Sequence, residues 1–192
     1  MAETRFTLIQ KMKNNPDENS WDEFDQTYRP YIIGIVRKLN FDYHENEDMT
    51  QMIMVKLWKG LQNFDYRPGE CRFRSWVAIV ARNAVTQNLS LNRNKMLKKM
   101  DGDLEVDGVS APEIEEVAFE EWKEFILQKA MEYTQQQFKE QVFEVFLKFT
   151  EGMKAEEVAV ATGVAPGSVY VYKKRVEAVL KKEILRLNEE LG

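Results

Sequence analysis

The 192-residue sequence predicts an all-α protein of two small helical domains joined by an acidic linker. Apolar residues recur at spacings of three and four, as on one face of an α-helix, and no segment shows the alternation of a β-strand. A stretch rich in acidic residues and glycine separates two segments in which basic residues predominate. This division favours two domains, each long enough for a modest core.

The first predicted helix lies in SWDEFDQTYRPYIIGIVRKLN, residues 20–40. Ser20 is expected to be its N-cap, and Pro30 is expected to bend or interrupt it. The residues expected to face the core share one face of the helix, and they are Trp21, Phe24, Tyr28, Ile32, Ile35 and Leu39.

The second predicted helix runs from about Glu47 to Leu61, with Asn46 as its N-cap, and is followed by a loop over residues 63–70. Its segment MTQMIMVKLWKGL places apolar residues in every quarter of the helical wheel, whereas a surface helix leaves one side polar. Either this helix lies at the centre of its bundle, or it packs against its own core on one side and a partner on the other.

The third predicted helix, residues 72–99, contains seven Lys or Arg and no acidic residue, although the chain has 27 basic against 32 acidic residues and a formal charge of −5. Lys and Arg can neutralise phosphates, and Asn and Gln can bond base edges, so this face suits a separated nucleic-acid strand. The alternative is a solvated basic face with the aromatic residues in the core. The predicted core stripe is Phe73, Trp76, Val77, Val80 and Ala84, and the side chains expected away from it are Arg74, Arg82, Asn83, Thr86 and Gln87.

The acidic segment DGDLEVDGVSAPEIEEVAFEE, residues 101–121, has nine acidic and no basic residues. Its glycines, together with Ser110 and Pro112, predict a linker over residues 100–120 between domains at 1–99 and 121–192. Further helices are expected near Glu113–Tyr133 and Gln136–Phe149.

A helix-turn-helix is predicted in AEEVAVATGVAPGSVYVYKK, residues 155–174, with Ala159 at the helix crossing and Gly163 in the turn. The alternative is a helical hairpin that binds nothing. The recognition helix is expected to begin near Pro166. Residues expected to face a major groove are Pro166, Gly167, Tyr170, Val171 and Lys174, and those expected to reach phosphates are Ser168, Lys173 and Arg175.

The sequence disfavours an enzyme, a metal site and a bound cofactor. It has one histidine, His44, and one cysteine, Cys71, and it lacks a glycine-rich phosphate loop and a GxSxG motif. His44 lies in the acidic run HENED, which we interpret as the start of a helix, with a metal or acid–base site as the alternative. No apolar run is long enough to span a membrane, and no signal peptide is evident, so we expect a cytoplasmic protein without membrane insertion.

The segments ENEDMTQMIMVKLWKGLQNFD and FRSWVAIVARNAVTQNL resemble region 2 of bacterial sigma-70 family factors, and EGMKAEEVAVATGVAPGSVYVYKKRVEAVLKKEI resembles their region 4. The two regions without a third domain are typical of the extracytoplasmic-function (ECF) group. The resemblance implies that the second helix binds the clamp helices of the large catalytic subunit of core RNA polymerase. The matching positions are Asp48, Gln51, Met52 and Lys56.

The resemblance also implies that the basic third helix and the preceding loop read the −10 promoter element as a single strand. The loop would contribute Phe64, Tyr66 and Arg67, and Asn83 and Gln87 match positions that face the non-template strand. The helix-turn-helix would read the −35 element as duplex DNA. An anti-sigma factor is a possible further partner. The main alternative is a two-domain transcriptional regulator that binds duplex DNA without core polymerase.

Overall fold

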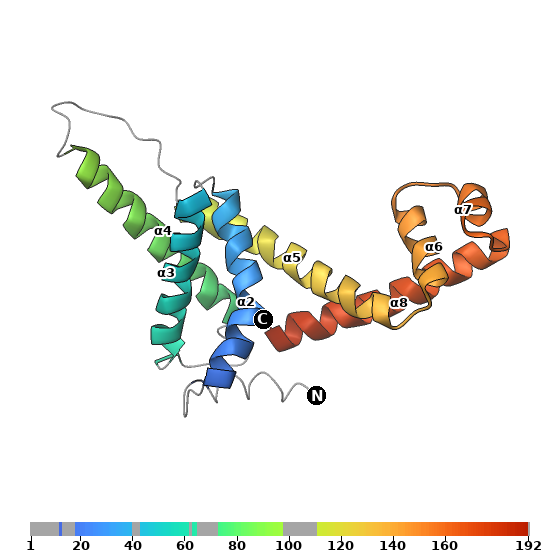
Figure 1. Cartoon of the computed structure of the whole chain (residues 1–192), viewed down its shortest axis with the longest axis horizontal. Helices are drawn as coiled ribbons and strands as arrows, with labels where there is room; N and C mark the ends of the chain where they lie inside the picture. Colours follow the sequence, from blue (N-terminus) through green and yellow to red (C-terminus); the bar gives the residue numbers. More distant parts are fainter. Residues whose placement is uncertain are drawn as a thin grey trace. The chain divides into compact units, whose positions relative to one another are not determined.

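The computed structural model describes residues 12, 18–39, 43–61, 63–64, 73–97 and 111–191. The regular secondary structure in these ranges is entirely α-helical (Figure 1), which confirms the predicted fold class. The described residues form two compact units: unit 1 runs up to Phe125 and includes residues 190–191, and unit 2 is Ile126–Glu189. The helices are α2 (Glu18–Lys38), α3 (Tyr43–Leu61), α4 (Phe73–Leu97), α5 (Ala111–Gln136), α6 (Glu140–Thr150), α7 (Ala155–Thr162) and α8 (Pro166–Leu191).

Unit 1 is built on α2, α3 and α4, with α3 packed against both of the others. The predicted stripe of α2 is buried from Phe24 to Leu39, and Trp21 is half-buried. Phe24, Tyr28 and Phe73 meet with ring centroids 4.9–6.1 Å apart, which joins α2 to the start of α4. Such tilted and edge-to-face pairs add to the stabilisation that burial alone provides.

Two details of the predicted helix boundaries are wrong. Both α2 and α3 begin earlier than predicted, so Ser20 and Asn46 lie inside the helices instead of at their N-caps. The second correction concerns Pro30, which was expected to bend or interrupt α2: the helix continues through Pro30, so the interruption is wrong. The ring of Pro30 is exposed while its neighbours Tyr31 and Ile32 are buried, and this packing holds the helix continuous despite the intrinsic cost of proline.

The first half of α5 packs as a fourth helix of unit 1, where the sequence predicted a linker up to residue 120. Ile114, Ala118, Trp122 and Phe125 are buried at spacings of four, four and three. The hydroxyl of Tyr31 donates to the carbonyl of Ala118 at 2.9 Å. The helix predicted near Glu113–Tyr133 is confirmed, whereas the packing of its apolar stripe on unit 1 was not predicted. Residues 101–110 of the predicted linker lie outside the described residues.

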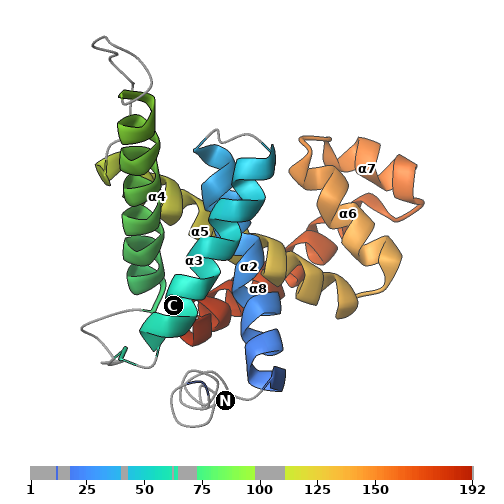
Figure 2. The same cartoon turned by 60° about the vertical axis from the view of Figure 1, so that its left-hand side comes forward.

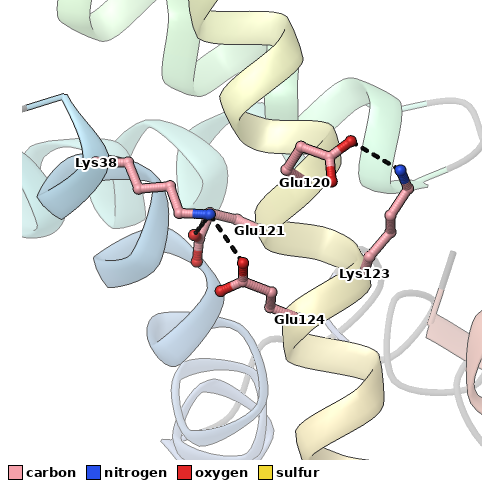
Figure 3. A network of polar contacts seen from close by, with 5 residues as sticks. All are labelled: Lys38, Glu120, Glu121, Lys123 and Glu124. Atoms are coloured by element: carbon pink, nitrogen blue, oxygen red, sulfur yellow. Dashed lines mark hydrogen bonds and ion pairs between the residues drawn. The ribbon is translucent and has the colours of Figure 1, made fainter.

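Ion pairs also join α5 to α2 (Figure 3). The Lys38 Nζ lies 2.6 Å from a carboxylate oxygen of Glu121 and 3.0 Å from one of Glu124. Hydrogen bonds to Glu121 and Glu124 raise the pKa of Lys38. The two helices approach closely at Gly34, where a methyl group would overlap the carboxylate of Glu121. An alanine at this position would have to displace that carboxylate from its ion pair with Lys38.

Unit 2 contains the predicted helix-turn-helix, formed by α7 and α8, with α6 packed against α7 (Figure 2). Gly163 has φ of 69°, a left-handed conformation that ends α7 and that glycine adopts without strain. The prediction of a turn at Gly163 and of a second helix from Pro166 is confirmed. The core consists of Val145, Ala155, Val158, Ala159 and Val169, with Phe149, Met153, Val164 and Tyr172 packed against it.

Candidate polymerase and promoter interface

The outer face of α3 exposes apolar side chains. Met49, Ile53, Met54, Leu57 and Leu61 are buried toward the core. On the other side, Met52 is 37% exposed and Val55 is 41% exposed. Of the two interpretations of this helix, enclosure at the centre of the bundle is therefore wrong. The exposed apolar residues lie in the same helical segment as Asp48 and Gln51, which are also exposed.

Lys56, predicted to bind polymerase, contacts a residue predicted to read DNA. Its Nζ donates to the side-chain oxygen of Gln87 on α4 at 2.8 Å. The fold thus brings together one residue predicted for polymerase binding and one predicted for the −10 element. Gly60 and Trp76 mark another close approach of the same two helices, since a methyl group at Gly60 would overlap the indole ring.

The polar side chains of α4 divide between two surroundings. Asn83, Thr86 and Gln87 are exposed, as predicted for residues outside the core. Arg74 and Arg82 instead face the first half of α5. The guanidinium of Arg74 lies 5.8 Å from the ring centroid of Trp122.

The contact of Arg82 with α5 is an ion pair with the carboxylate of Glu115. Glu115 lies both in the predicted linker and in the helix predicted near Glu113–Tyr133, and no role was predicted for it. The periodicity of Ile114, Ala118 and Trp122 was the signal that could have placed it on a packed helix. Between α4 and α5 lies a groove of about 240 Å³, with the half-exposed Ile79 and Phe119 among its lining residues.

The predicted core stripe of α4 is confirmed for Phe73, Val77 and Ala84, which are buried. Trp76 and Val80 are half-buried.

The loop residues predicted to contact the −10 element are only partly described. Phe64 is 6% exposed, and its ring packs 4.6 Å from Trp76 and 5.6 Å from Phe73. The expectation that Phe64 meets DNA is therefore corrected, because its aromatic surface is already buried in the core of unit 1. Tyr66 and Arg67 lie outside the described residues.

The first turns of α8 present the predicted duplex-reading side chains. Ser168 and Lys173 are half-buried. Lys173 lies over the ring of Phe149 at 4.3 Å and 3.5 Å from a carboxylate oxygen of Glu177. The exposed members of the predicted set are Pro166, Gly167, Tyr170, Val171, Lys174 and Arg175.

One large apolar residue exposed on the helix-turn-helix was not singled out from the sequence. Val160 on α7 is 85% exposed. An isolated exposed valine is common on protein surfaces and identifies no binding site by itself.

Within the described ranges, no three His, Cys, Asp or Glu side chains are grouped so that they could hold a metal ion. The His44 side chain and Cys71 lie outside these ranges, so the alternative metal site at His44 stays untested. None of the described helices is both long and apolar enough to cross a lipid bilayer.

Comparison with known proteins identifies the class of unit 1. Residues 24–94 match the family described as Sigma-70 region 2, and this segment includes most of α2, all of α3 and most of α4. The domain that these helices build is therefore similar to that family.

A curated relative is the ECF RNA polymerase sigma factor SigE of Mycolicibacterium smegmatis, which is 23% identical over 150 residues. This alignment covers 78% of the chain and 56% of the relative, so the chain spans about half the length of that protein. A solved structure titled "Structure of CnrH in complex with the cytosolic domain of CnrY" aligns at 17% identity with a TM-score of 0.39, covering 93% of this chain and 95% of the solved chain. The resemblance to ECF sigma factors predicted from the sequence is confirmed.

Proposed function

We propose that the chain is an ECF-type sigma factor that binds core RNA polymerase and directs transcription initiation at promoters. The observation that carries this proposal is the outer face of α3, in a domain similar to the sigma-70 region 2 family. Met52 and Val55 are large apolar side chains left exposed in the same segment as Asp48 and Gln51. An apolar centre with polar neighbours is the usual composition of a protein–protein interface.

Recognition of the −10 element is assigned to the exposed polar residues of α4. Asn83, Thr86 and Gln87 lie within one helical turn, and all three are exposed. Amide and hydroxyl groups can donate to base edges or accept from them, whereas the aromatic residues of this domain are largely packed in its core. Phe64 is not included in this assignment.

Recognition of the −35 element is assigned to α8. Tyr170, Val171 and Lys174 are exposed in the first turns of the second helix of a helix-turn-helix, the position that enters a major groove in proteins of this kind. Arg175 is exposed beside them and can neutralise a phosphate. Region 2 and region 4 would then read separate promoter elements, one as single strand and one as duplex.

The test is run-off transcription with purified core RNA polymerase and a library of genomic promoter fragments. The full chain should produce transcripts that core polymerase alone does not. Val55→Glu should abolish co-purification with core polymerase, because a carboxylate would be buried without a partner at the contact. Leu91→Glu is the matched control, since Leu91 is an exposed aliphatic residue of α4, outside the proposed contact.

A duplex-binding regulator that never contacts polymerase is the competing function. It would bind promoter fragments through α8 and would show no co-purification with core polymerase in the wild-type chain. In that case Val55→Glu and Leu91→Glu would behave alike, and the assignment of α3 would be wrong.

A further inference from the structure

Three polar side chains form a continuous chain from α5 to α4 inside unit 1. One terminal nitrogen of Arg82 forms an ion pair with Glu115. The Nε and the other terminal nitrogen of Arg82 each donate to the side-chain oxygen of Asn83 at 3.3 Å. The planar guanidinium of Arg82 therefore connects the carboxylate of Glu115 on one side to the side-chain amide of Asn83 on the other.

The position of Glu115 is determined by the packing of the helix that carries it. Ile114 and Ala118, on either side of Glu115 in the sequence, are both fully buried, and Trp122 is 2% exposed. The Tyr31–Ala118 hydrogen bond and the close approach at Gly34 hold the same face of α5 against α2. The core of unit 1 thus places Glu115 beside Arg82, although the two residues are 33 positions apart in the sequence.

The consequence for Asn83 concerns which of its amide atoms a ligand can meet. The carbonyl oxygen of an Asn side chain accepts hydrogen bonds, and its NH₂ group offers two donors. Because the oxygen of Asn83 already accepts from Arg82, the exposed side chain presents its NH₂ group to a ligand.

We propose that Glu115, acting through Arg82, is a positioning residue that fixes the amide of Asn83 so that it donates to the base it reads. This inference rests on the proposed reading of the −10 element by α4. It implies selection for a base edge with acceptors, such as guanine N7 and O6, over an edge that presents a donor, such as cytosine N4.

Glu115 could instead act only by neutralising Arg82 and so weakening attraction to phosphates. The geometry favours positioning for two reasons. The ion pair is partly exposed, with side-chain exposures of 30% for Arg82 and 49% for Glu115, and partly exposed pairs compete weakly with a phosphate. Neutralisation would also leave the two contacts with Asn83 without a role. The experiment below distinguishes positioning of Asn83 from neutralisation of the Arg82 charge.

The experiment measures base preference with the full chain. A pool of single-stranded DNA dodecamers of random sequence is selected on each variant, and the bound sequences are counted. The variants are Glu115→Ala, Arg82→Lys and Asn83→Ala. Glu116→Ala is the matched control, since Glu116 is an exposed carboxylate on the same helix that makes no ion pair with any described residue. Tryptophan fluorescence checks that each variant is folded.

The expected result is the loss of one base preference. Glu115→Ala and Arg82→Lys should each reduce the preference at one position by about tenfold, as Asn83→Ala does, while Glu116→Ala retains it. Arg82→Lys keeps the positive charge and loses the fork, so its loss would separate positioning from charge.

Three outcomes would overturn the inference. If Glu115→Ala binds every sequence more tightly by the same factor and keeps its preferences, Glu115 only masks charge. If Asn83→Ala loses a preference and Glu115→Ala does not, positioning fails and the −10 assignment stands. If the wild type selects no sequence, both the positioning and the reading of DNA by α4 are wrong.

Discussion

The two helices proposed to meet DNA, α4 with four basic residues and α8 with six, differ in how the cations beside their proposed contacts are engaged. On α4, Arg82 forms an ion pair with Glu115 and Arg74 lies against Trp122. On α8, Lys174 and Arg175 are exposed and form no ion pair with any of the described residues. The charge of a helix therefore does not give the number of cations that it can offer to phosphates, because packed neighbours can engage some of them.

The difference originates in what covers each helix. The acidic first half of α5 packs on unit 1 through Ile114, Ala118 and Trp122 and brings its carboxylates with it. In unit 2 the buried face of α8 meets the largely apolar core around Val158 and Val169. The opposite side of its first turns is left uncovered within that unit.

The largest expected effect tests whether α5 is an integral part of unit 1. Trp122→Ala should lower the free energy of unfolding of unit 1 by about 3–5 kcal/mol, since a buried tryptophan is lost from the core. Denaturant unfolding followed by tryptophan fluorescence reports on unit 1 alone, because all four tryptophans precede residue 126. Phe119→Ala, at a residue 51% exposed, is the control and should change the midpoint little. Equal effects of the two changes would mean that α5 is not docked.

A pair of glycine substitutions sharpens the comparison, because the two should have opposite signs. Gly34→Ala should destabilise unit 1 by about 1–3 kcal/mol, since the added methyl overlaps Glu121. Gly167→Ala, at the start of α8, meets no atom within 4 Å and should stabilise unit 2 by up to about 1 kcal/mol. Hydrogen exchange of amides in each unit measures both effects. Destabilisation at both sites would contradict the open surroundings of Gly167.

Salt dependence tests how many cations each helix offers to DNA. Lys174→Gln should reduce the slope of log affinity against log salt for duplex DNA by about 0.9, the value for one lost phosphate contact. Arg82→Gln should change the slope for a single strand by less than about 0.7, because the donors of the guanidinium are already engaged by Asn83 and Glu115. Binding titrations of each variant from low to physiological salt give the slopes. A full-sized change for Arg82→Gln would show that the ion pair opens when DNA binds.

The smallest effect on stability is expected from substituting Tyr31, which lies at the contact of α2 with α5. Burial raises the pKa of Tyr31, so the folded protein keeps its phenolic proton after the unfolded chain has begun to lose it near pH of about 10. Over that range the unfolded state binds fewer protons, and stability must fall as pH rises. Tyr31→Phe should flatten this fall, at a cost of about 0.5–1.5 kcal/mol at neutral pH for the lost bond to Ala118.

The measurement is unfolding free energy between neutral pH and pH of about 11, the range in which free tyrosine titrates. Lys38, whose pKa is raised by hydrogen bonds to Glu121 and Glu124, contributes a residual slope of the same sign in both proteins. Tyr170→Phe is the control, because Tyr170 is 53% exposed and lies in unit 2, outside the contact of α2 with α5. An unchanged pH profile in Tyr31→Phe would contradict the buried position of the hydroxyl.

The features that the sequence predicted well depend on short stretches of chain. The stripe on α2, the core positions Phe73, Val77 and Ala84, and the turn at Gly163 follow from helical periodicity or from the conformational freedom of one glycine. The resemblance to sigma-70 region 2 also rests on continuous segments. Local spacing was sufficient in each case, because the interacting residues are neighbours along the helix or in the turn.

The sequence alone determined an all-helical chain with a helix-turn-helix and an apolar surplus on α3. Only the tertiary structure decided that residues 111–125 join the first unit, that Phe64 is buried, and that Glu115 engages Arg82. The physical reason is distance along the chain. Helical periodicity shows which side of α5 is apolar, but the helix that covers α4, and hence the partner of Arg82, depends on how the apolar faces of α2, α4 and α5 pack together.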